Sequence, residues 1–471
     1  MQASRSEFLV RSKPLIRKLI TLLSADYEYV SVLGTDTKGK TYTVSKTGID
    51  INDYLLVERG FVVRIHNGVN YSEYSFNELS EEKLPEIIGE IKAKLNKAAP
   101  EIAVNTYDKI EEEELTKQFF SEVEENPETI SPEVIVKELT RVMEAASELS
   151  ELIINFRTGF NCIHVSKIYL SDKKDLEQSY LTCEARLFCM VRREDTMKYA
   201  YKSFSGMKGY ELVRELERNY KKVVEEGIQL LDAKPVKPGV YDVICAPDIT
   251  GLIAHEAFGH GVEMDMFVKG RAKGAEYMGK EVASPITTMH DGAAAITHMS
   301  SYLFDDEGTL GTDTTIIKDG ILRNGISDLL SAMKLGTAPT GNGKRQSFER
   351  KAYTRMTNTF FEEGKDTYED MLASIKFGYQ LEGMQSGMED PKNWGIQCIV
   401  MLGREIVDGK FTGNLISPVV LTGYVPDLLK SISMVAGEID LEGAGFCGKG
   451  YKEYVKTANG GPYIKAKVRL G

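Results

Sequence analysis

Two histidines flank a glutamate near the middle of the chain, in the order His255, Glu256 and His260. The chain has only 6 histidines in 471 residues, so chance rarely produces such a triple. Neutral imidazoles bind Zn²⁺ well, and a carboxylate beside the first one can reach a water held by the metal. Zinc lowers the pKa of that water toward about 7, so the glutamate can pass the remaining proton to a leaving amine. This pattern indicates metal-assisted hydrolysis of peptide bonds.

The five-residue spacing of the two histidines predicts an irregular helix. At about 100° per residue, five steps place the two side chains about 140° apart. Both rings can face one ion only if the backbone widens, as in a π-bulge, or if the helix ends early. Gly259 and Gly261 supply the necessary backbone freedom. We therefore expect a widened or broken helix over 255–260.

A third metal ligand must come from elsewhere in the chain. A catalytic zinc site normally has three protein ligands and keeps the fourth position for water. Cys447 is a credible thiolate ligand because glycines flank it and Lys449 would lower its pKa. The other candidates are two nearby carboxylates and two more distant imidazoles: Glu263, Asp265, His290 and His298.

Several further segments complete a pattern that resembles a known family. They are residues 305–309, 340–345, 355–359, 432–434 and 445–449. With the HExxxH motif, they make the chain from about residue 240 onward similar to the TldD branch of the TldD/PmbA family. The resemblance implies a cytosolic zinc metallopeptidase.

Carried onto this chain, the family pattern gives each motif residue a role. Zinc would be held by His255, His260 and Cys447, and Glu256 would be the general base. Glu263 and Asp265 follow closely, and we expect them to be hydrogen-bond partners of the ligand imidazoles.

The resemblance also implies partners. It predicts a homodimer, or a heterodimer with a TldE/PmbA-like subunit, that encloses the active sites in a chamber. Such a chamber admits unfolded peptides, and an extended peptide could add to a sheet edge near the metal. The chain departs from the family pattern at 383–391 and after Cys447, which bears on substrate preference.

Two other functions fit the same residues. Cys447 could itself be the nucleophile of a cysteine hydrolase, assisted by a histidine. Alternatively, the chain could be a metal-stabilised subunit that binds peptides or regulates a partner without hydrolysis.

The glycine-rich segments 341–345 and 443–448 lack the context of nucleotide-binding loops. We expect Asp305, Asp306 and Glu307 to form a surface turn rather than a cation site.

Composition narrows the class of protein. With 58 Lys and Arg against 70 Asp and Glu, the net charge is −12, which argues against direct nucleic-acid binding. The 6 cysteines form no CxxC pair and indicate reduced thiols. No apolar run approaches the roughly 18 residues of a membrane span. We therefore expect a cytoplasmic protein that is not inserted in a membrane.

The hydrophobic pattern predicts an α+β fold in two parts: an α/β-layered N-terminal region and a mainly antiparallel β C-terminal catalytic region. We divide the chain into an α+β unit at 1–100, a second α+β segment with an acidic linker at 101–235, and a mainly β metallopeptidase domain at 236–471. Helices are expected at 14–25, 84–97, 134–145 and 209–231. Strands are expected at 27–32, 41–44, 61–65, 151–156, 161–170, 179–191, 241–245, 314–317, 396–402 and 417–422.

Overall fold

The computed structural model describes residues 1–95, 106–450 and 453–471. These residues fold around two large sheets, one of 8 strands and one of 11 strands, with helices packed against both. Most strand pairs are antiparallel, so the expected mixed α+β fold is confirmed. Within the described residues, no helix has the length and apolar character needed to cross a membrane.

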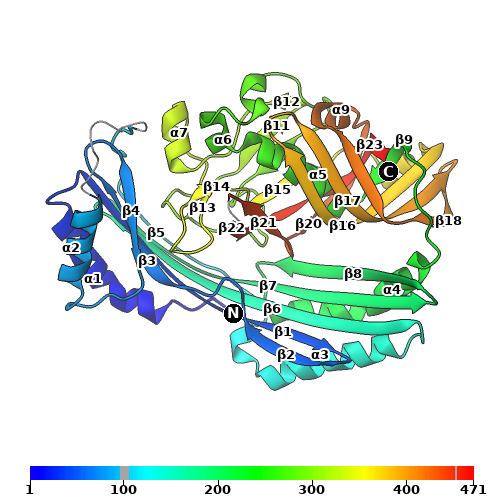
Figure 1. The fold of residues 1–471 in the computed structure, drawn as a ribbon, viewed down its shortest axis with the longest axis horizontal. Coiled ribbons are helices and arrows are strands. Elements are labelled where there is room, and N and C mark those ends of the chain that lie inside the picture. The colour runs from blue at the N-terminus through cyan, green and yellow to red at the C-terminus, as the bar shows by residue number, and fades with distance from the viewer. Residues whose placement is uncertain (96–105, 451–452) are drawn as a thin grey trace.

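The N-terminal sheet consists of long strands that extend beneath the C-terminal region (Figure 1). The sequence predicts separate strands at 27–32 and 41–44, but the chain continues as one strand. Thr35, Asp36 and Thr37 between them are buried: Asp36 accepts from Arg59, and the Thr37 hydroxyl donates to the Leu56 carbonyl. The strands are β1 (Tyr29–Ser45), β2 (Gly48–Asp53), β3 (Arg59–His66), β4 (Tyr71–Phe76), β5 (Leu115–Phe120), β6 (Ile153–Ser171), β7 (Lys174–Arg193) and β8 (Thr196–Gly206).

Strands from both sides of residue 100 share this sheet. β1 pairs with β6 from Ser31↔Ser171 to Ser45↔Arg157. The expected units 1–100 and 101–235 therefore do not have separate sheets. Long-range pairing of this kind leaves no local signal in the sequence, because each strand shows only its own alternation.

Four main helices cover the N-terminal sheet, and α3 lies on the side away from the C-terminal region (Figure 1). The first helix begins earlier than predicted, because the Ser6 hydroxyl caps it by accepting from the Leu9 N–H. Pro14 consequently lies inside the helix instead of at its start. The helices are α1 (Glu7–Leu23), α2 (Leu84–Leu95), α3 (Pro132–Ser147) and α4 (Val213–Leu230), with 3₁₀ turns η2 (Pro127–Thr129) and η3 (Tyr210–Leu212).

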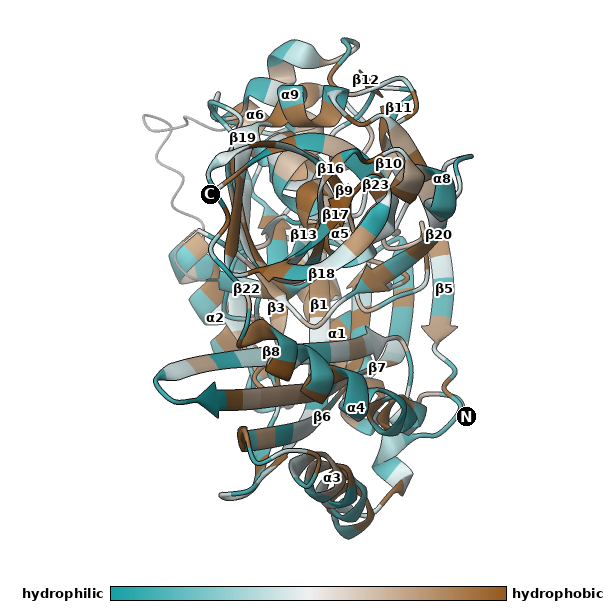
Figure 2. Cartoon of the chain, turned by 90° about the vertical axis from the view of Figure 1, so that its right-hand side faces the viewer, coloured by the Kyte–Doolittle hydropathy of each residue, from teal (hydrophilic) through white to brown (hydrophobic). Residues whose placement is uncertain are grey.

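The C-terminal sheet curves around a short central helix, α5 (Pro247–Ala254), which Figure 2 shows enclosed by the strands. Every residue of α5 from Ile249 to Ala254 is buried, because the helix packs against β23, β16 and β15. The strands of this sheet are β9 (Gly239–Cys245), β10 (Met289–Asp291), β11 (Thr314–Lys318), β12 (Ile321–Leu322), β15 (Asn358–Phe361), β16 (Phe377–Asp390), β17 (Gly395–Val407), β18 (Lys410–Ile416), β19 (Val419–Tyr424), β20 (Met434–Glu442) and β23 (Ala458–Leu470).

Shorter elements complete the C-terminal region and carry much of its polar chemistry. Two small hairpins stand apart from the main sheet: β13 (Gly343–Lys344) with β14 (Tyr353–Thr354), and β21 (Phe446–Lys449) with β22 (Glu453–Lys456). The remaining helices are η4 (His255–Gly259), η5 (His260–Val262), α6 (Met264–Val268), η6 (Lys273–Tyr277), α7 (Leu329–Leu335), α8 (Tyr368–Ala373) and α9 (Val425–Lys430).

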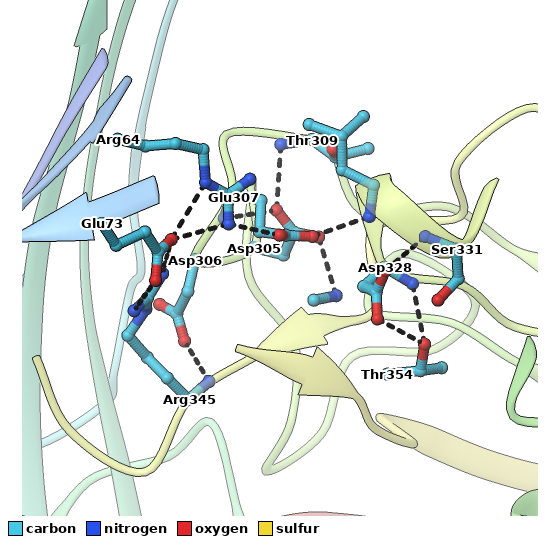
Figure 3. Close-up of polar contacts among 12 residues, drawn as sticks. Arg64, Glu73, Asp305, Asp306, Glu307, Thr309, Asp328, Ser331, Arg345 and Thr354 are labelled. Atoms are coloured by element: carbon cyan, nitrogen blue, oxygen red, sulfur yellow. Dashed lines mark hydrogen bonds and ion pairs between the residues drawn. The ribbon is translucent and has the colours of Figure 1, made fainter. Parts of the chain in front are cut away.

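Buried ion pairs hold the two regions together in a cluster that we call the polar joint (Figure 3). Arg64 of β3 donates to Glu73 of β4 at 2.7 Å and to Glu307 at 2.5 Å. Arg345 reaches back to Glu73 at 3.0 Å. Asp305 accepts from three backbone N–H groups, including that of Gly343 at 2.8 Å. Asp306 completes the joint by accepting from Lys167 and from the Arg345 N–H.

The polar joint corrects the expected surface turn at 305–307. Asp305, Asp306 and Glu307 are only 2%, 4% and 3% exposed. Three consecutive acidic residues are usually exposed to solvent. Here they are buried, because cationic side chains that are distant in the sequence pair with them. The cluster is therefore a structural contact between the N-terminal sheet and the C-terminal region.

Candidate metal centre

The helix that carries the histidine motif changes geometry within the motif. After α5, residues His255–Gly259 form a π-helical turn, in which the His260 N–H donates to the His255 carbonyl five residues back. A 3₁₀ turn, His260–Val262, follows. A Cβ at Gly259 would lie 2.0 Å from the Met356 sulfur, so a larger residue there would force the buried Met356 side chain to move. The widened helix predicted from the five-residue spacing is confirmed.

This widening brings together the three predicted ligands from two distant segments. One donor atom from each of His255, His260 and Cys447 lies within 4.8 Å of the others. The Cys447 Sγ is 3.4 Å from the His260 Nε2. In a tetrahedral zinc site with Zn–N near 2.1 Å and Zn–S near 2.3 Å, these two atoms would lie about 3.6 Å apart. Two imidazoles and one thiolate in this arrangement fit a zinc ion.

The two alternative imidazole ligands lie elsewhere. Both ring nitrogens of His290 already meet carboxylates, Asp313 at 2.6 Å and Glu362 at 2.7 Å. His298 lines a different cavity, beside Lys208 on the side of β8. Neither belongs to the group of candidate ligands found among the described residues.

The two local carboxylates contact the site without joining the ligand group. The Glu263 Oε2 lies 3.2 Å from the His260 Nδ1, on the side of the ring opposite Cys447. Lys449 bridges the pair of acids, at 3.0 Å from Glu263 and 2.7 Å from Asp265. Burial alone would raise the pKa of Glu263, but Lys449 and His260 lower it to about 2. Glu263 is therefore a charged acceptor that can orient the His260 ring.

The low pKa expected for Cys447 has a different source from the one predicted. Burial would raise the pKa of this thiol, but the His260 and His255 rings hold it well below its usual value. Lys449 instead faces Glu263 and Asp265. The two rings thus favour the thiolate form of Cys447, which is the form that binds a metal.

Buried cations also fix the hairpin that presents Cys447. Arg355, which is 1% exposed, donates to the Cys447 carbonyl from one nitrogen and to the Glu453 carbonyl from another. Lys456 donates to the Ala444 carbonyl at 2.8 Å and pairs with Glu184 of β7 at 3.2 Å. The segment before Cys447 is thus tied to the N-terminal sheet.

Glu256 lies between the motif helix and β16. Its side chain is 7% exposed, and it belongs to the lining of the same cleft as the three candidate ligands. A Cβ at Gly387 would lie 2.4 Å from the Glu256 Cγ, so only glycine lets β16 approach this closely. The strand consequently forms a wall over the candidate base.

Glu389, two residues further along β16, is a site residue that sequence reasoning missed. Both of its carboxylate oxygens are buried and have no hydrogen-bond partner among the described residues. Burial is the main reason that the pKa of Glu389 rises to about 9, although His260 opposes the shift. The departure from the family pattern at 383–391 is the one sequence signal near it, and that segment is a strand rather than a link.

The candidate ligands and base line a cleft of about 700 Å³. One wall is β16, which pairs with β17 from Phe377 to Asp390 but with β9 only at Gly378–Leu381. Among the described strands, the second edge of β16 beyond Met384 therefore has no strand partner. This edge borders the cleft, which Gln385 to Glu389 line.

Comparison with known proteins agrees with this architecture. Residues 238–468 match the model of the PmbA/TldA metallopeptidase C-terminal domain. A metalloprotease of Methanothermobacter thermautotrophicus is 29% identical over 58% of this chain and 59% of its own length. A zinc metalloprotease TldD homolog of Saccharolobus solfataricus is 28% identical over 64% of this chain and 67% of its own. The chain thus spans about three fifths to two thirds of these relatives.

Solved structures share the whole fold. A Thermotoga maritima protein proposed as a modulator of a DNA gyrase matches with a TM-score of 0.78 at 16% identity, over 98% of this chain and all of that one. TldE from Thermococcus kodakarensis matches with a TM-score of 0.73 at 19% identity, over 97% and 100%. The fold and the domain match define a PmbA/TldA-type metallopeptidase domain on an N-terminal α+β region. Residues 238–468 thus belong to the PmbA/TldA metallopeptidase domain family, and the Saccharolobus relative is named a TldD homolog.

Proposed function

We propose that this protein is a zinc-dependent peptidase in which His255, His260 and Cys447 hold the metal. The observation that carries the proposal is the convergence of these three donors beside a buried glutamate, inside a cleft of about 700 Å³. The metalloprotease names of the relatives support the same class of reaction. When bound in such a site, zinc polarises the scissile carbonyl and acidifies water.

Side chains of the protein transfer the protons and orient the ligands. Glu256 accepts a proton from the attacking water and delivers it to the leaving amine nitrogen, because its carboxylate is the one that directly follows the first ligand. Glu263 fixes the orientation of the His260 ring through the Nδ1 contact at 3.2 Å. Asp265 acts at one further remove, by holding Lys449 against Glu263.

The substrate binds as an extended strand along the free edge of β16. Backbone groups of the peptide would pair with Gln385 to Glu389, which places the scissile bond over the cleft that the candidate ligands line. Backbone pairing carries no sequence code, so unfolded peptides of varied sequence would be accepted. Backbone groups that already pair inside a folded protein cannot pair with this edge.

The likeness to TldE supports a dimeric assembly, either with a TldE/PmbA-like subunit or with a second copy. We place the enzyme in the cytoplasm, because its 6 cysteines are free thiols. Size measurement of the protein alone and with a TldE-type subunit tests the assembly.

The substitution Glu256→Gln tests the proposed base. It preserves shape while removing the proton acceptor, so hydrolysis of an unfolded protein should fall about 10²- to 10⁴-fold. Zinc content, measured by mass spectrometry of the purified protein, should stay at the parent level. A zinc-loaded Glu256→Gln protein that hydrolyses peptides at the parent rate would overturn the assignment.

One observation favours a second candidate, a cysteine hydrolase. The Cys447 thiol has a lowered pKa beside two imidazoles, as nucleophilic cysteines do. A chelator separates the two mechanisms: the zinc peptidase loses activity and regains it with added Zn²⁺. Activity that survives removal of metal but stops after thiol alkylation would favour the cysteine nucleophile.

A third candidate, a subunit that binds peptides or regulates a partner without cleaving, finds support in the gyrase-modulator description of a structural neighbour. It predicts that Glu256→Gln leaves the biological function intact. Peptide hydrolysis by the purified parent protein, abolished in that variant, would exclude this candidate.

A further inference from the structure

The edge of β16 that borders the metal cleft changes its hydrogen-bond partner along its length. β9 pairs with this edge from Gly378 to Leu381, and the Ala246 N–H extends the pairing by donating to the Leu381 carbonyl at 3.0 Å. The chain then enters α5 at Pro247, so β9 continues no further. Backbone groups of β16 beyond Leu381 must therefore find other partners or stay free for a ligand.

Asp248, in the first turn of α5, takes the N–H groups that come next. Gly383 has a φ of +80°, a left-handed conformation that interrupts the regular alternation of the strand. The Gly383 and Met384 N–H groups both donate to the Asp248 Oδ2, each at 2.8 Å. These two donors are consequently not available to a peptide.

Tyr201 takes the carbonyl that follows them. It lies on β8, the strand that runs directly beneath the C-terminal region (Figure 1), and its hydroxyl donates to the Met384 carbonyl. Tyr199, two residues earlier on β8, instead accepts from the Gln385 side-chain Nε2 at 2.9 Å. We call Asp248 and Tyr201 the edge stop, because a peptide could pair with Gly383 or Met384 only by breaking hydrogen bonds that already exist.

A turn closes the other end of the same edge. The Asp390 carbonyl accepts from the Trp394 N–H at 2.6 Å, and the Pro391 carbonyl accepts from the Lys273 N–H at 2.9 Å. Pro391 has no N–H group of its own. Between the two ends lies the segment Gln385–Glu389, which pairs with β17 on one edge and with no described strand on the other.

The free segment is short enough to limit what it can recognise. Its five residues span about 17 Å at about 3.3 Å per residue. In an antiparallel ladder, alternate residues direct their N–H and C=O groups to the same neighbour, so two or three of these residues face a new partner. Ser386 and Met388 are exposed and the whole segment lines the metal cleft, so a peptide can reach it.

We propose that Asp248 and Tyr201 are specificity-determining residues that limit backbone recognition of the substrate to the segment Gln385–Glu389. This inference rests on the proposed peptidase function and names its substrate class: short peptides and unfolded chains in which about five consecutive residues can be extended. Beyond the edge stop, the substrate backbone leaves the plane of the sheet. Additional residues there contribute no further backbone pairing.

A series of peptide lengths tests this limit, with the Glu256→Gln protein in Zn²⁺ so that binding is measured without cleavage. The peptides share one neutral repeating sequence, are capped at both ends, and run from three to eleven residues. Affinity should rise about 3- to 10-fold for each two residues added and level off at about five residues, because each step adds one residue that pairs with β16. A rise that continues equally steeply to eleven residues would overturn the edge stop.

Tyr201→Ala in the same background removes the hydroxyl and the ring, which frees the Met384 carbonyl. Peptides of seven or more residues should then bind about 3- to 10-fold tighter than they bind the protein with Tyr201. Tyr199→Ala is the matched control, since Tyr199 bonds only a side chain of β16, and it should keep the original plateau. Zinc content at the parent level checks that both variants are folded. An unchanged plateau in a folded Tyr201→Ala protein, or the same shift in both variants, would overturn the role of Tyr201.

Failure of the proposed function would give different results. Methylation of single backbone nitrogens in the five-residue peptide should weaken binding at alternate positions, because a methylated nitrogen cannot donate. Indifference to methylation at every position would overturn strand pairing itself, and so would the absence of binding at every length; the edge stop would fall with it. Failure of the parent protein to hydrolyse any peptide would overturn the peptidase alone, since the length limit is measured by binding.

Discussion

The polar joint and the candidate metal centre both bury charged groups, but different atoms remain without partners in each. In the joint, Asp305 accepts backbone N–H groups and Glu73 accepts from two guanidinium groups. The buried atoms left over there are donors, the Arg64 Nη1 and the Arg345 Nε. At the metal centre, the buried atoms left over include both oxygens of Glu389.

This difference separates a structural cluster from a functional one. Unpaired carboxylate oxygens attract a proton or a cation, and burial accordingly raises the pKa of Glu389 to about 9. Surplus guanidinium donors do not bind cations. Unpaired guanidinium donors occur at both clusters, since the Arg355 Nε beside the Cys447 hairpin also lacks a partner. The unpaired carboxylate of Glu389 is therefore what distinguishes the metal centre.

Removal of the sulfur ligand should have the largest effect, and it should affect the metal centre but not the polar joint. Cys447→Ala leaves two imidazoles, and we expect zinc affinity to fall on the order of 10³-fold and peptide hydrolysis to become undetectable. Thermal unfolding of the metal-free protein should hardly change, because the joint is untouched. Competition with a chromophoric chelator measures the affinity, and parent-like zinc binding by the variant would exclude Cys447 as a ligand.

A change in the polar joint should do the opposite: it should lower the stability of the fold, in a pH-dependent way, and leave zinc binding unchanged. Burial alone would raise the pKa of Glu73, but Arg64 and Arg345 lower it to about 2. A carboxylate with a depressed pKa stabilises the fold above its unfolded value near 4.5, and this contribution is lost as the pH falls toward 2. The shift corresponds to roughly 3 kcal/mol at neutral pH.

Glu73→Gln should therefore lower the free energy of unfolding at pH 7 by about that amount, and the difference from the parent should close between pH 4.5 and pH 2. Denaturant unfolding at several pH values measures it. Glu438→Gln, a change of an exposed glutamate with no ion-pair partner in the described chain, serves as the control. Zinc affinity should be unchanged in both variants; a loss of affinity in Glu73→Gln would mean that the joint supports the metal centre.

Local features were predictable from the sequence, and contacts between distant segments were not. The five-residue spacing of His255 and His260 fixes the need for a widened helix, which is why the π-helical turn could be predicted. The fate of the acids at 305–307 depends on Arg64 and Lys167, which lie more than a hundred residues earlier. No local pattern reveals those partners.

Cys447 shows where a family resemblance adds to physical reasoning. Residue chemistry alone left five candidates for the third ligand, and the structure places only the sulfur beside both rings. Glu389, in contrast, was found by neither the resemblance nor the residue chemistry. It reaches the site because β16 passes over the motif helix, and the spacing of residues in the sequence does not reveal where a strand lies in the fold. The partner of Lys449 was also mispredicted, since Glu263 and Asp265 compete for it better than the thiol.

The smallest expected effect concerns Lys449, which lies within the metal centre itself. The Glu263 Oε2 is shared by the His260 Nδ1 at 3.2 Å and the Lys449 Nζ at 3.0 Å, so one carboxylate connects the motif helix to the hairpin that carries Cys447. Lys449→Met keeps the aliphatic stem but removes this connection, and zinc affinity should fall about 10- to 100-fold. Lys449→Arg should restore much of the affinity, because it keeps the charge.

Lys269→Met is the matched control, since Lys269 pairs with Asp265 at 3.0 Å but does not contact Glu263. Absorption of the Co²⁺-substituted protein gives a second readout, because the thiolate-to-cobalt band reports whether Cys447 still coordinates. We expect this band to weaken in Lys449→Met at limiting cobalt and to persist in Lys269→Met. Equal zinc affinities in the two lysine variants would show that the contribution of Lys449 is its general charge and not the connection through Glu263.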